Sequence, residues 1–444
     1  MNLRRTTLVL LATLTAATAG GFSAEPIAPL GPLARPDADG FSALFNGTDT
    51  TGWIGATKGY PAVDGVMVCQ KRGGGNLYTR WRFADFHFKF DFKLTPGANN
   101  GLGIRVPPRG NPANECMELQ ILDNTSPRYA KLKPYQYHGS IYGLVPAKRG
   151  ALAPVGQWNR QEVIADGTKI KVILNDKTIV DADLSKMKIP ARGYCSKSLR
   201  PAGHIGWAGH GAEIHFKNIK VKPIDTYARG PHNEPPAGFT ALFNGKDLTG
   251  WRGRPHLDPA KEAAMSAAQK AAQQAKWDAS VARDWKVADG QIVNAGRGVY
   301  LTTKKDYGNF EMLIDYKTVA RADSGIYLRA NPQVQIWDFT KAGGKWKLGA
   351  DKGSGGLWNN KKNSRWPAVL ADKPFGLWNR MRIKLVGDKV TVHLNGELIV
   401  DKVTMENYFA RGKPLPTRGP IQLQTHGGEI RWRNIFIREI GEAK

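Results

Sequence analysis

The sequence predicts an all-β protein made of two β-sandwiches in tandem. With 444 residues the chain is long enough for two or three domains, and its 50 Gly, 27 Pro and 13 Trp favour short strands and tight turns over long helices. Short stretches of alternating apolar and polar residues are separated by Gly, Pro, Asn and Asp at hairpin spacing, which is typical of two packed antiparallel sheets. Most of these stretches occur twice in the same order, so the chain is a tandem duplication.

The duplication is clearest where each unit begins. Residues 41–53 and 239–251 share the pattern Phe-x-Ala-Leu-Phe-Asn-Gly-x-Asp-x-Thr-Gly-Trp. Later matches keep the same order: 86–92 with 310–316, 100–105 with 323–329 at an offset of one residue, 158–159 with 378–379, 170–180 with 390–400, and 210–219 with 426–435. We therefore place the first sandwich at residues 36–224, a Pro- and Gly-rich linker at 225–237, and the second sandwich at 238–440.

One segment of the second unit has no counterpart in the first. Residues 258–281 are rich in Ala, Lys and Gln, and Pro259 stands near their start. Pro is favoured in the first turn of a helix and Ala, Lys and Gln within one, so the segment predicts a helical insertion. We expect a solvated surface helix rather than one that contacts a partner.

Residues 1–24 predict an export signal. Arg4 and Arg5 form its basic start, residues 8–14 its apolar core, and Ala17-Thr18-Ala19 a small-residue cleavage site. The apolar run is shorter than the roughly 20 residues that span a bilayer. The sequence thus predicts a periplasmic or extracellular protein with no transmembrane segment after signal removal.

Charge and cysteine content restrict the partners and the redox chemistry. A formal net charge of +26 favours anionic surroundings such as acidic polysaccharide or the cell envelope. The Lys and Arg residues are spread along the chain without an arm, zinc finger or recognition helix, so a nucleic-acid partner is not expected. Cys69, Cys116 and Cys195 allow at most one disulfide and do not indicate which pair forms it.

The strongest candidate for chemistry is the stretch at residues 117–123, which reads Met-Glu-Leu-Gln-Ile-Leu-Asp. On a strand, Glu118 and Gln120 lie on one face, and the alternate apolar residues lie on the other. Asp123 follows at the strand end. The second unit reads Gln-Val-Gln-Ile-Trp-Asp at residues 333–338, so Gln333 stands where the first unit has the carboxylate of Glu118.

These motifs together resemble the 3-keto-disaccharide hydrolase domain family. The resemblance is carried by the opening Leu-Phe-Asn-Gly motif, the Gly-x-x-x-Arg strand, the Glu-x-Gln-x-x-Asp strand, the Trp-Asn pair and the late His-Gly, and it covers nearly the whole chain twice. It implies two concanavalin A-like lectin/glucanase jelly-roll sandwiches in an exported carbohydrate-active hydrolase. The first unit departs from the family at Trp207-Ala208, where Leu-Gln is usual, and the second departs at Gln333.

The resemblance implies a reaction in which the 3-keto group acidifies the proton on C2. A base removes that proton, the glycosidic oxygen leaves C1, and water adds back. For the first domain we expect the catalytic residues Glu118 as base, Arg105 as enolate stabiliser, and Asp123 or His210 as acid. The residues expected to bind substrate in the two domains are Gln120, Tyr142, Gln335, Trp358, Arg329 and His426. The second domain is expected to bind carbohydrate or to support the first.

Other interpretations of the same residues remain open. Glu118 and Arg105 could form only a cross-strand ion pair, Asp123 only a turn, and His210 only a cap. As a function, a retaining glucanase would need two catalytic carboxylates, which the Glu-x-Gln-x-x-Asp spacing fits poorly. A non-catalytic pair of carbohydrate-binding modules is the third interpretation, favoured for the second domain by Gln333. A lectin-like fold makes a divalent cation such as Ca²⁺ the cofactor to consider, with no ligand spacing to locate it.

Overall fold

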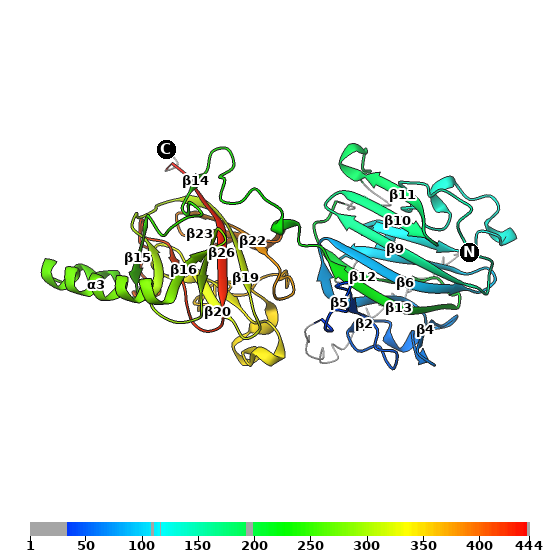
Figure 1. Ribbon diagram of the computed structural model, residues 1–444, viewed down its shortest axis with the longest axis horizontal. Helices are drawn as coiled ribbons and strands as arrows, with labels where there is room; N and C mark the ends of the chain where they lie inside the picture. The colour runs from blue at the N-terminus through cyan, green and yellow to red at the C-terminus, as the bar shows by residue number, and fades with distance from the viewer. Residues whose placement is uncertain (1–32, 108–110, 116, 192–198, 442–444) are drawn as a thin grey trace, which may run out of the picture.

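The computed structural model describes residues 33–107, 111–115, 117–191 and 199–441 and contains two β-sandwiches joined by one linker (Figure 1). The predicted export signal at residues 1–24 lies outside the described residues. Within them, no helix is both long and apolar enough to span a membrane. Cys69 is a buried free thiol, whereas Cys116 and Cys195 fall outside the described residues.

The first sandwich packs an eight-stranded sheet on a five-stranded sheet. The larger sheet has the order β11-β10-β9-β6-β13-β4-β3, with β1 beside β13, and the smaller has the order β2-β5-β12-β7-β8. The larger sheet comprises β1 (Ser42–Ala43), β3 (Ala62–Val63), β4 (Val66–Cys69), β6 (Phe86–Leu94), β9 (Trp158–Asp166), β10 (Lys169–Leu174), β11 (Lys177–Asp183) and β13 (Ile214–Pro223). The smaller comprises β2 (Trp53–Gly55), β5 (Asn76–Phe83), β7 (Asn99–Val106), β8 (Met117–Leu122) and β12 (Gly203–Gly209).

The second sandwich repeats this topology strand for strand. Its sheets have the orders β24-β23-β22-β19-β26-β17-β16, with β14 beside β26, and β15-β18-β25-β20-β21. The larger sheet comprises β14 (Thr240–Ala241), β16 (Trp285–Ala288), β17 (Gln291–Asn294), β19 (Phe310–Thr318), β22 (Asn379–Val386), β23 (Lys389–Leu394), β24 (Glu397–Thr404) and β26 (Ile430–Glu439). The smaller comprises β15 (Trp251–Arg254), β18 (Tyr300–Thr303), β20 (Asp323–Tyr327), β21 (Gln333–Trp337) and β25 (Gln422–Leu423). The predicted fold class is thereby confirmed.

Alternation along the strands produces the core between the two sheets. In β6, Phe86, Phe88, Phe90 and Phe92 are all buried, whereas His87 and Lys89 between them are partly exposed. Residues two apart on a strand share a face, so these rings form one stripe against the smaller sheet. Across the core the rings of Trp207 on β12 and Phe216 on β13 stack with their centroids 4.0 Å apart. The smaller sheet therefore has its apolar face turned inward and its other face free to carry polar residues.

Short helices connect these strands. The described α-helices are α1 (Pro112–Glu115), α2 (Pro259–Ala263) and α3 (Ala267–Asp284). The 3₁₀ helices are η1 (Thr57–Gly59), η2 (Pro127–Tyr129), η3 (Pro134–Gln136), η4 (Leu184–Lys186), η5 (Thr226–Ala228), η6 (Lys341–Gly343), η7 (Trp346–Leu348) and η8 (Ala350–Lys352).

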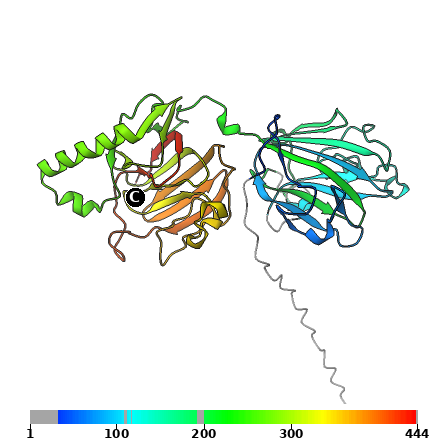
Figure 2. The same cartoon turned by 60° about the horizontal axis from the view of Figure 1, so that its bottom comes forward.

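The helical insertion of the second domain is anchored to an edge strand. Figure 2 shows α3 projecting from one side of the second sandwich, far from the first. Asp278 accepts a hydrogen bond from the backbone N–H of Gly253 at 2.9 Å, and Gln274 donates to the carbonyl of Gly253 at 3.0 Å. Gly253 lies on β15, an edge strand whose backbone groups would otherwise be unpaired. The helix exposes most of its surface as expected, but it also buries Trp277 and protects this edge.

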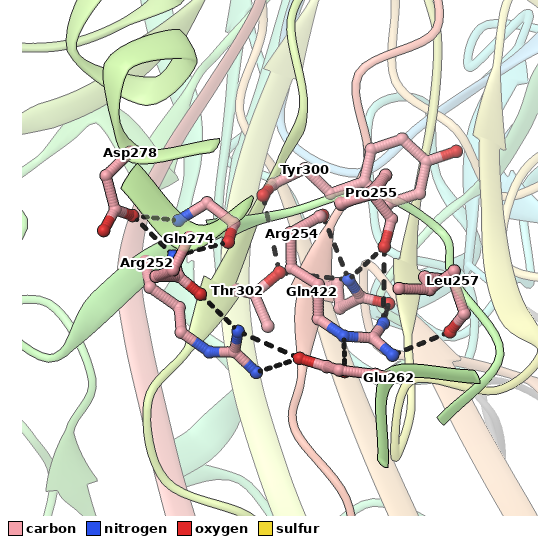
Figure 3. Close-up of polar contacts among 11 residues, drawn as sticks. Arg252, Arg254, Pro255, Leu257, Glu262, Gln274, Asp278, Tyr300, Thr302 and Gln422 are labelled. Atoms are coloured by element: carbon pink, nitrogen blue, oxygen red, sulfur yellow. Dashed lines mark hydrogen bonds and ion pairs between the residues drawn. The ribbon is translucent and has the colours of Figure 1, made fainter. Parts of the chain in front are cut away.

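A second contact of the insertion is a partly buried ion-pair network at the start of the helices (Figure 3). Arg254 is 1% exposed and donates to Glu262 of α2 at 2.6 Å and to the carbonyl of Leu257 at 2.7 Å. Arg252 contacts the same carboxylate at 3.3 Å. Glu262 therefore holds α2 against the outer face of the smaller sheet.

The two sandwiches also contact each other directly. Arg82 of the first domain forms an ion pair with Glu397 of the second at 2.7 Å. Nearby, the rings of Trp81 and Phe339 meet edge to face with centroids 5.8 Å apart. Arg82, Trp81 and Phe339 are buried and Glu397 is partly buried, so the ion pair is less accessible to solvent than one on the open surface.

Candidate active site

Strand β8 carries the polar face predicted from its sequence. Glu118 and Gln120 lie opposite Gly103 and Gly101 of β7 in the register, on the face turned away from the core. The other side of β8 pairs with the following loop through three backbone hydrogen bonds: Gln120 N–H to Ser140, Gly139 N–H to Gln120, and Tyr142 N–H to Glu118. These contacts fix the strand on both sides, so its polar side chains are held rigidly.

One oxygen of the buried Glu118 carboxylate has no hydrogen-bond partner among the residues that the structure describes. Glu118 is 3% exposed, and among the described residues its Oε1 atom accepts no hydrogen bond. The side chain lies flat over Gly101, where a Cβ atom would come within 1.8 Å of Oε1. Glycine is therefore required at position 101 for the carboxylate to lie where it does. A buried, unpaired acceptor costs free energy unless a ligand or water satisfies it, so Glu118 is an available acceptor or base.

His210 is a titratable neighbour of this carboxylate. Its Nε2 atom lies 3.7 Å from Glu118 Oε1, beyond direct hydrogen-bond distance, and its side chain is half exposed. The interaction with Glu118 outweighs partial burial and raises the pKa of the His210 imidazole above its ordinary value. His210 is thus more readily protonated than a free histidine, which suits a proton donor facing solvent.

Gln120 and Tyr142 lie beside this pair. Gln120 Nε2 donates to Asn99 Oδ1 on β7 at 3.0 Å, which fixes its amide on the same sheet face. Tyr142 is partly exposed, and its hydroxyl accepts a hydrogen bond from Gln136 at 2.7 Å. Its backbone N–H donates to the carbonyl of Glu118, so Tyr142 lies at the edge of the site.

Asp123 lies at the end of β8, and both of its carboxylate oxygens accept hydrogen bonds within a turn. Its Oδ2 accepts from the N–H of Gly97 at 2.8 Å, and its Oδ1 accepts from both the N–H and the hydroxyl of Thr125. Burial alone would raise the pKa of Asp123, but the hydrogen bonds from Thr125, Gly97 and Ser126 outweigh it and lower the pKa. An ionised carboxylate with a lowered pKa is a poor proton donor, so the geometry gives the predicted acid role of Asp123 no support.

Arg105 does not face the carboxylate either. Its φ angle of +53° interrupts the alternation of β7 at the strand end. All three guanidinium nitrogens donate elsewhere, to the carbonyls of Ala84 and Gly167 at 2.7 and 2.8 Å and to Asp85 at 3.0 Å. The predicted role as enolate stabiliser has no support in this geometry, because the guanidinium joins loops at the sheet edge.

The second domain repeats both the arginine contacts and the aspartate turn of the first. Arg329 has a φ angle of +54° and donates to the carbonyls of Gly308, Gly387 and Pro416. Asp338 accepts from the N–H and hydroxyl of Thr340, as Asp123 does from Thr125. Their recurrence in the second copy shows that the arginine and aspartate belong to the shared scaffold. Arg329 is predicted to bind substrate, but its guanidinium donates to backbone carbonyls and joins neighbouring loops, so this geometry gives a substrate-binding role no support.

The second domain has its own polar cluster, centred on Asp323 of β20. Gln335 Nε2 donates to Asp323 Oδ1 at 2.8 Å, and His426 Nδ1 lies 2.7 Å from Asp323 Oδ2. Lys345 forms an ion pair with the same oxygen. Gln333 donates to Gln335, so the two amides and the aspartate form one chain of hydrogen bonds. Gln335 and His426, both predicted to bind substrate, therefore lie together around Asp323, a carboxylate that was not among the predicted site residues.

The sequence would point to Asp323 if the two repeats were aligned so that Gly101 matches Gly325. Gly101 pairs with Gln120 in the first domain, and Gly325 pairs with Gln335 in the second. This register makes Asp323 the counterpart of Asn99. Trp358 is likewise the counterpart of Tyr142, because Gly139 and Gly355 pair with the equivalent glutamines. The carboxylate has thus moved between adjacent strands from one copy to the other.

The described residues contain no group of three or more His, Cys, Asp or Glu side chains placed to hold a metal ion. A divalent cation such as Ca²⁺ stays a prediction without a located site.

Two jelly-roll sandwiches with a carboxylate, an imidazole and amides on an outer sheet face define a lectin-like, carbohydrate-active class of protein. The chain belongs to the family described as the 3-keto-alpha-glucoside-1,2-lyase-like domain, which matches residues 40–222 and again 238–438. The family resemblance predicted from the motifs is thereby confirmed, in two tandem copies.

Individual relatives match a length of the chain that corresponds to one of the two copies. A 3-keto-disaccharide hydrolase of Bacteroides thetaiotaomicron is 25% identical over 232 residues, which cover 43% of this chain and 80% of that protein. Two crystal structures of proposed glycosyl hydrolases from Parabacteroides distasonis are 25% and 27% identical. They cover 42% and 41% of this chain and 95% and 99% of their own, each with a TM-score of 0.38.

Proposed function

We propose that the first domain cleaves 3-keto-glycosides, with Glu118 as the base and His210 as the acid. The observation that carries the proposal is the buried Oε1 of Glu118, which has no hydrogen-bond partner among the described residues and lies 3.7 Å from the His210 ring. The family descriptions and the relative's name supply the substrate class.

The proposed reaction starts when Glu118 removes the proton on C2 of the sugar, which the neighbouring ketone makes acidic. The electron pair of that C–H bond forms the C1–C2 double bond, and the glycosidic oxygen leaves C1 and takes a proton from His210. Water then adds across the double bond, with its oxygen on C1 and a proton on C2. The net result is hydrolysis of the glycosidic bond. General acid and base groups in such positions each contribute about 10²- to 10⁴-fold in rate.

Neighbouring residues would hold the sugar in place. The amide of Gln120 is fixed by Asn99 and faces the same side as Glu118, where it can bind a sugar hydroxyl. Tyr142 borders the site and can pack against the sugar ring. The glycines opposite Gln120 and Glu118 make room for neighbouring side chains: Glu118 itself lies over Gly101, and Val106 and Pro112 lie over Gly103.

The second domain would bind carbohydrate rather than cleave it. Lys345 and the amide of Gln335 already engage Asp323, so its carboxylate is charge-compensated. The Oε1 atoms of Gln333 and Gln424 are buried without partners in the described part of the chain. Both converge over Gly325, where a Cβ would lie 2.6 and 3.0 Å from them. Two unpaired amide oxygens are suited to accept hydrogen bonds from sugar hydroxyls.

A retaining glucanase is disfavoured by the same geometry. That mechanism needs a second carboxylate to act as nucleophile or acid beside the first. Asp123 accepts hydrogen bonds on both of its oxygens within a turn, and its lowered pKa does not suit an acid.

The test compares wild type with Glu118→Gln on 3-keto-glucosides and on the same glucosides before oxidation. We expect the variant to lose about 10³-fold in kcat on the keto substrates. Asp323→Asn, the matched change in the second domain, should keep kcat within about twofold. In D₂O, elimination followed by hydration places deuterium on C2 of the product. Product without deuterium at C2, or full activity in Glu118→Gln, would refute the mechanism.

A further inference from the structure

A broad groove in the second domain combines aromatic rings with positive charge. Its volume is about 850 Å³, which lies in the size range of ligand sites. Three of its aromatic residues are Trp358, Trp366 and Tyr408. Its cationic residues are Lys347, Lys352, Lys361, Arg365 and Arg411. Among the described residues that line it, none is acidic.

The aromatic rings position the cations. The guanidinium carbon of Arg365 lies 5.1 Å from the ring centroid of Trp358 and 4.6 Å from that of Trp366. Lys352 also lies over Trp366, at 5.2 Å. A guanidinium stacked on a ring keeps its N–H donors pointing outward in its own plane, where they can bind a planar anion.

Three of these cations lack a compensating charge. Within the described part of the chain, no ion pair or hydrogen bond engages the charged ends of the Lys347, Lys361 and Arg365 side chains, and the Nε of Arg365 is buried without a partner. The nearby carboxylate of Glu406 is already hydrogen-bonded to backbone groups. It accepts from the backbone N–H groups of residues 361–363, which lower its pKa to about 2 despite the opposing effect of burial.

The groove adjoins the sugar-binding face proposed for this domain. Trp337 lies directly opposite Asp323 in the sheet register, and its ring meets that of Trp358 at 6.4 Å. On the other side, Tyr408 packs against His256, whose ring also contacts Tyr327 on the outer sheet face. A chain bound at the amides of Gln333 and Gln424 would therefore continue into the groove.

We propose that this groove binds an acidic oligosaccharide, whose carboxylate or sulfate groups pair with Arg365 and Lys347. The proposal rests on the carbohydrate-binding role proposed for the second domain and is independent of catalysis by Glu118. Anionic groups would satisfy the unpaired donors, and charge-assisted bonds of this kind are the strong ones. A single strand of nucleic acid would need open aromatic faces for its bases, but Trp366 already carries two cations.

Within the described residues, the first domain has no counterpart of the stacked arginine in this groove. Tyr142 is the counterpart of Trp358, and the paired backbone contacts of Lys148 and Ala368 make Pro146 the counterpart of Trp366 and Val145 that of Arg365. The stacked guanidinium is thus absent from the equivalent place, so acidic-sugar binding should be a property of the second domain.

The experiment uses the full chain with Glu118→Gln, so that turnover does not consume the ligand. Binding is measured by calorimetry in about 0.15 M salt, where long-range attraction between exposed charges is largely screened. The probes are an oligogalacturonide, a sulfated dextran oligosaccharide, a neutral malto-oligosaccharide and a single-stranded oligonucleotide. Quenching of tryptophan fluorescence provides a second readout at the groove.

We expect Lys347→Gln/Arg365→Gln to weaken binding of an acidic oligosaccharide at least about tenfold, as lost charge-assisted hydrogen bonds do. The control Lys286→Gln/Lys384→Gln removes two exposed charges from the larger sheet and should change affinity less than about twofold. The oligogalacturonide and the sulfated probe separate the two sources of negative charge. The proposal is overturned if the control weakens binding equally, if the neutral sugar or the oligonucleotide binds more tightly, or if no acidic probe binds.

Discussion

The two domains share one scaffold but hold their carboxylates in different surroundings. In the first, the buried Oε1 atom of Glu118 on β8 has no hydrogen-bond partner in the described part of the chain and lies 3.7 Å from His210. In the second, Asp323 on β20 is contacted by Lys345, Gln335 and His426. The Asp323 carboxylate is therefore already engaged by its neighbours, whereas Oε1 of Glu118 has no partner within the described residues and can accept a hydrogen bond or a proton from a bound sugar. The difference supports a base in the first copy and a binding site in the second.

The faces around the two carboxylates also differ in bulk. At equivalent positions the first domain has Gly103 and the second has Tyr327, as the strand registers show. Residue 208 is alanine where the second domain has Gln424, whose amide donates to the Tyr300 hydroxyl at 3.2 Å. The duplication thus kept the sheets and changed the side chains on their outer face.

The shared scaffold should respond equally in both copies. Arg105→Leu and Arg329→Leu each remove a buried guanidinium and leave several buried carbonyls unsatisfied, so we expect each to cost about 3 kcal/mol of unfolding free energy in its own domain. Scanning calorimetry of the full chain measures both transitions. The exposed Arg72→Leu should change stability by less than about 0.5 kcal/mol. If Arg105→Leu instead lost most of its activity at unchanged stability, Arg105 would have a catalytic role and not only a structural one.

The two histidines should differ in catalysis. His210→Gln is expected to lower kcat about 10²-fold on 3-keto-glycosides with poor alkoxide leaving groups, because it removes the proposed acid. The loss should shrink for a nitrophenyl leaving group, which departs without a proton. His426→Gln should leave kcat within about twofold for both substrates. Equal losses with both leaving groups would assign His210 a positioning role instead.

The helical insertion distinguishes the domains in stability. Asp278→Ala removes the acceptor for the N–H of Gly253 on edge strand β15, at a cost of about 1–2 kcal/mol in the second domain alone. Chemical denaturation followed by circular dichroism measures the loss. Lys276→Ala, on the exposed side of the same helix, is the matched control and should be near neutral. If the two variants lose equally, the edge contact does not stabilise the domain.

The smallest expected effect is a change in the titration of His210. Because Glu118 raises its pKa, the imidazolium form persists to higher pH than for an ordinary histidine and is lost as pH rises through the raised pKa. Activity that depends on the protonated His210 should decline over the same range. In Glu118→Gln the pKa should fall toward the ordinary value, which NMR of the ring protons can follow. An unchanged pKa would mean that the carboxylate does not influence the imidazole.

Much of the site could be predicted from the strand pattern, but the roles of individual residues could not. The alternation at Glu118 and Gln120 placed them on one outer face, as the structure shows. Asp123 also lies where the sequence placed it, yet Thr125 and Gly97 bind its oxygens. Spacing along a strand gives the direction of a side chain, whereas its partners come from loops distant in sequence.

The sequence by itself determined the duplication, the sandwich fold and the polar face of β8, because a period of two residues separates the buried and exposed sides of a strand. Only the tertiary structure decided which charges meet. The register of β20 against β21 placed Asp323 beside Gln335, and the loop after β21 brought Lys345 to it. Cross-strand register and loop packing set those distances, so the carboxylate that is compensated and the one that is left unpaired are distinguished only in the folded molecule.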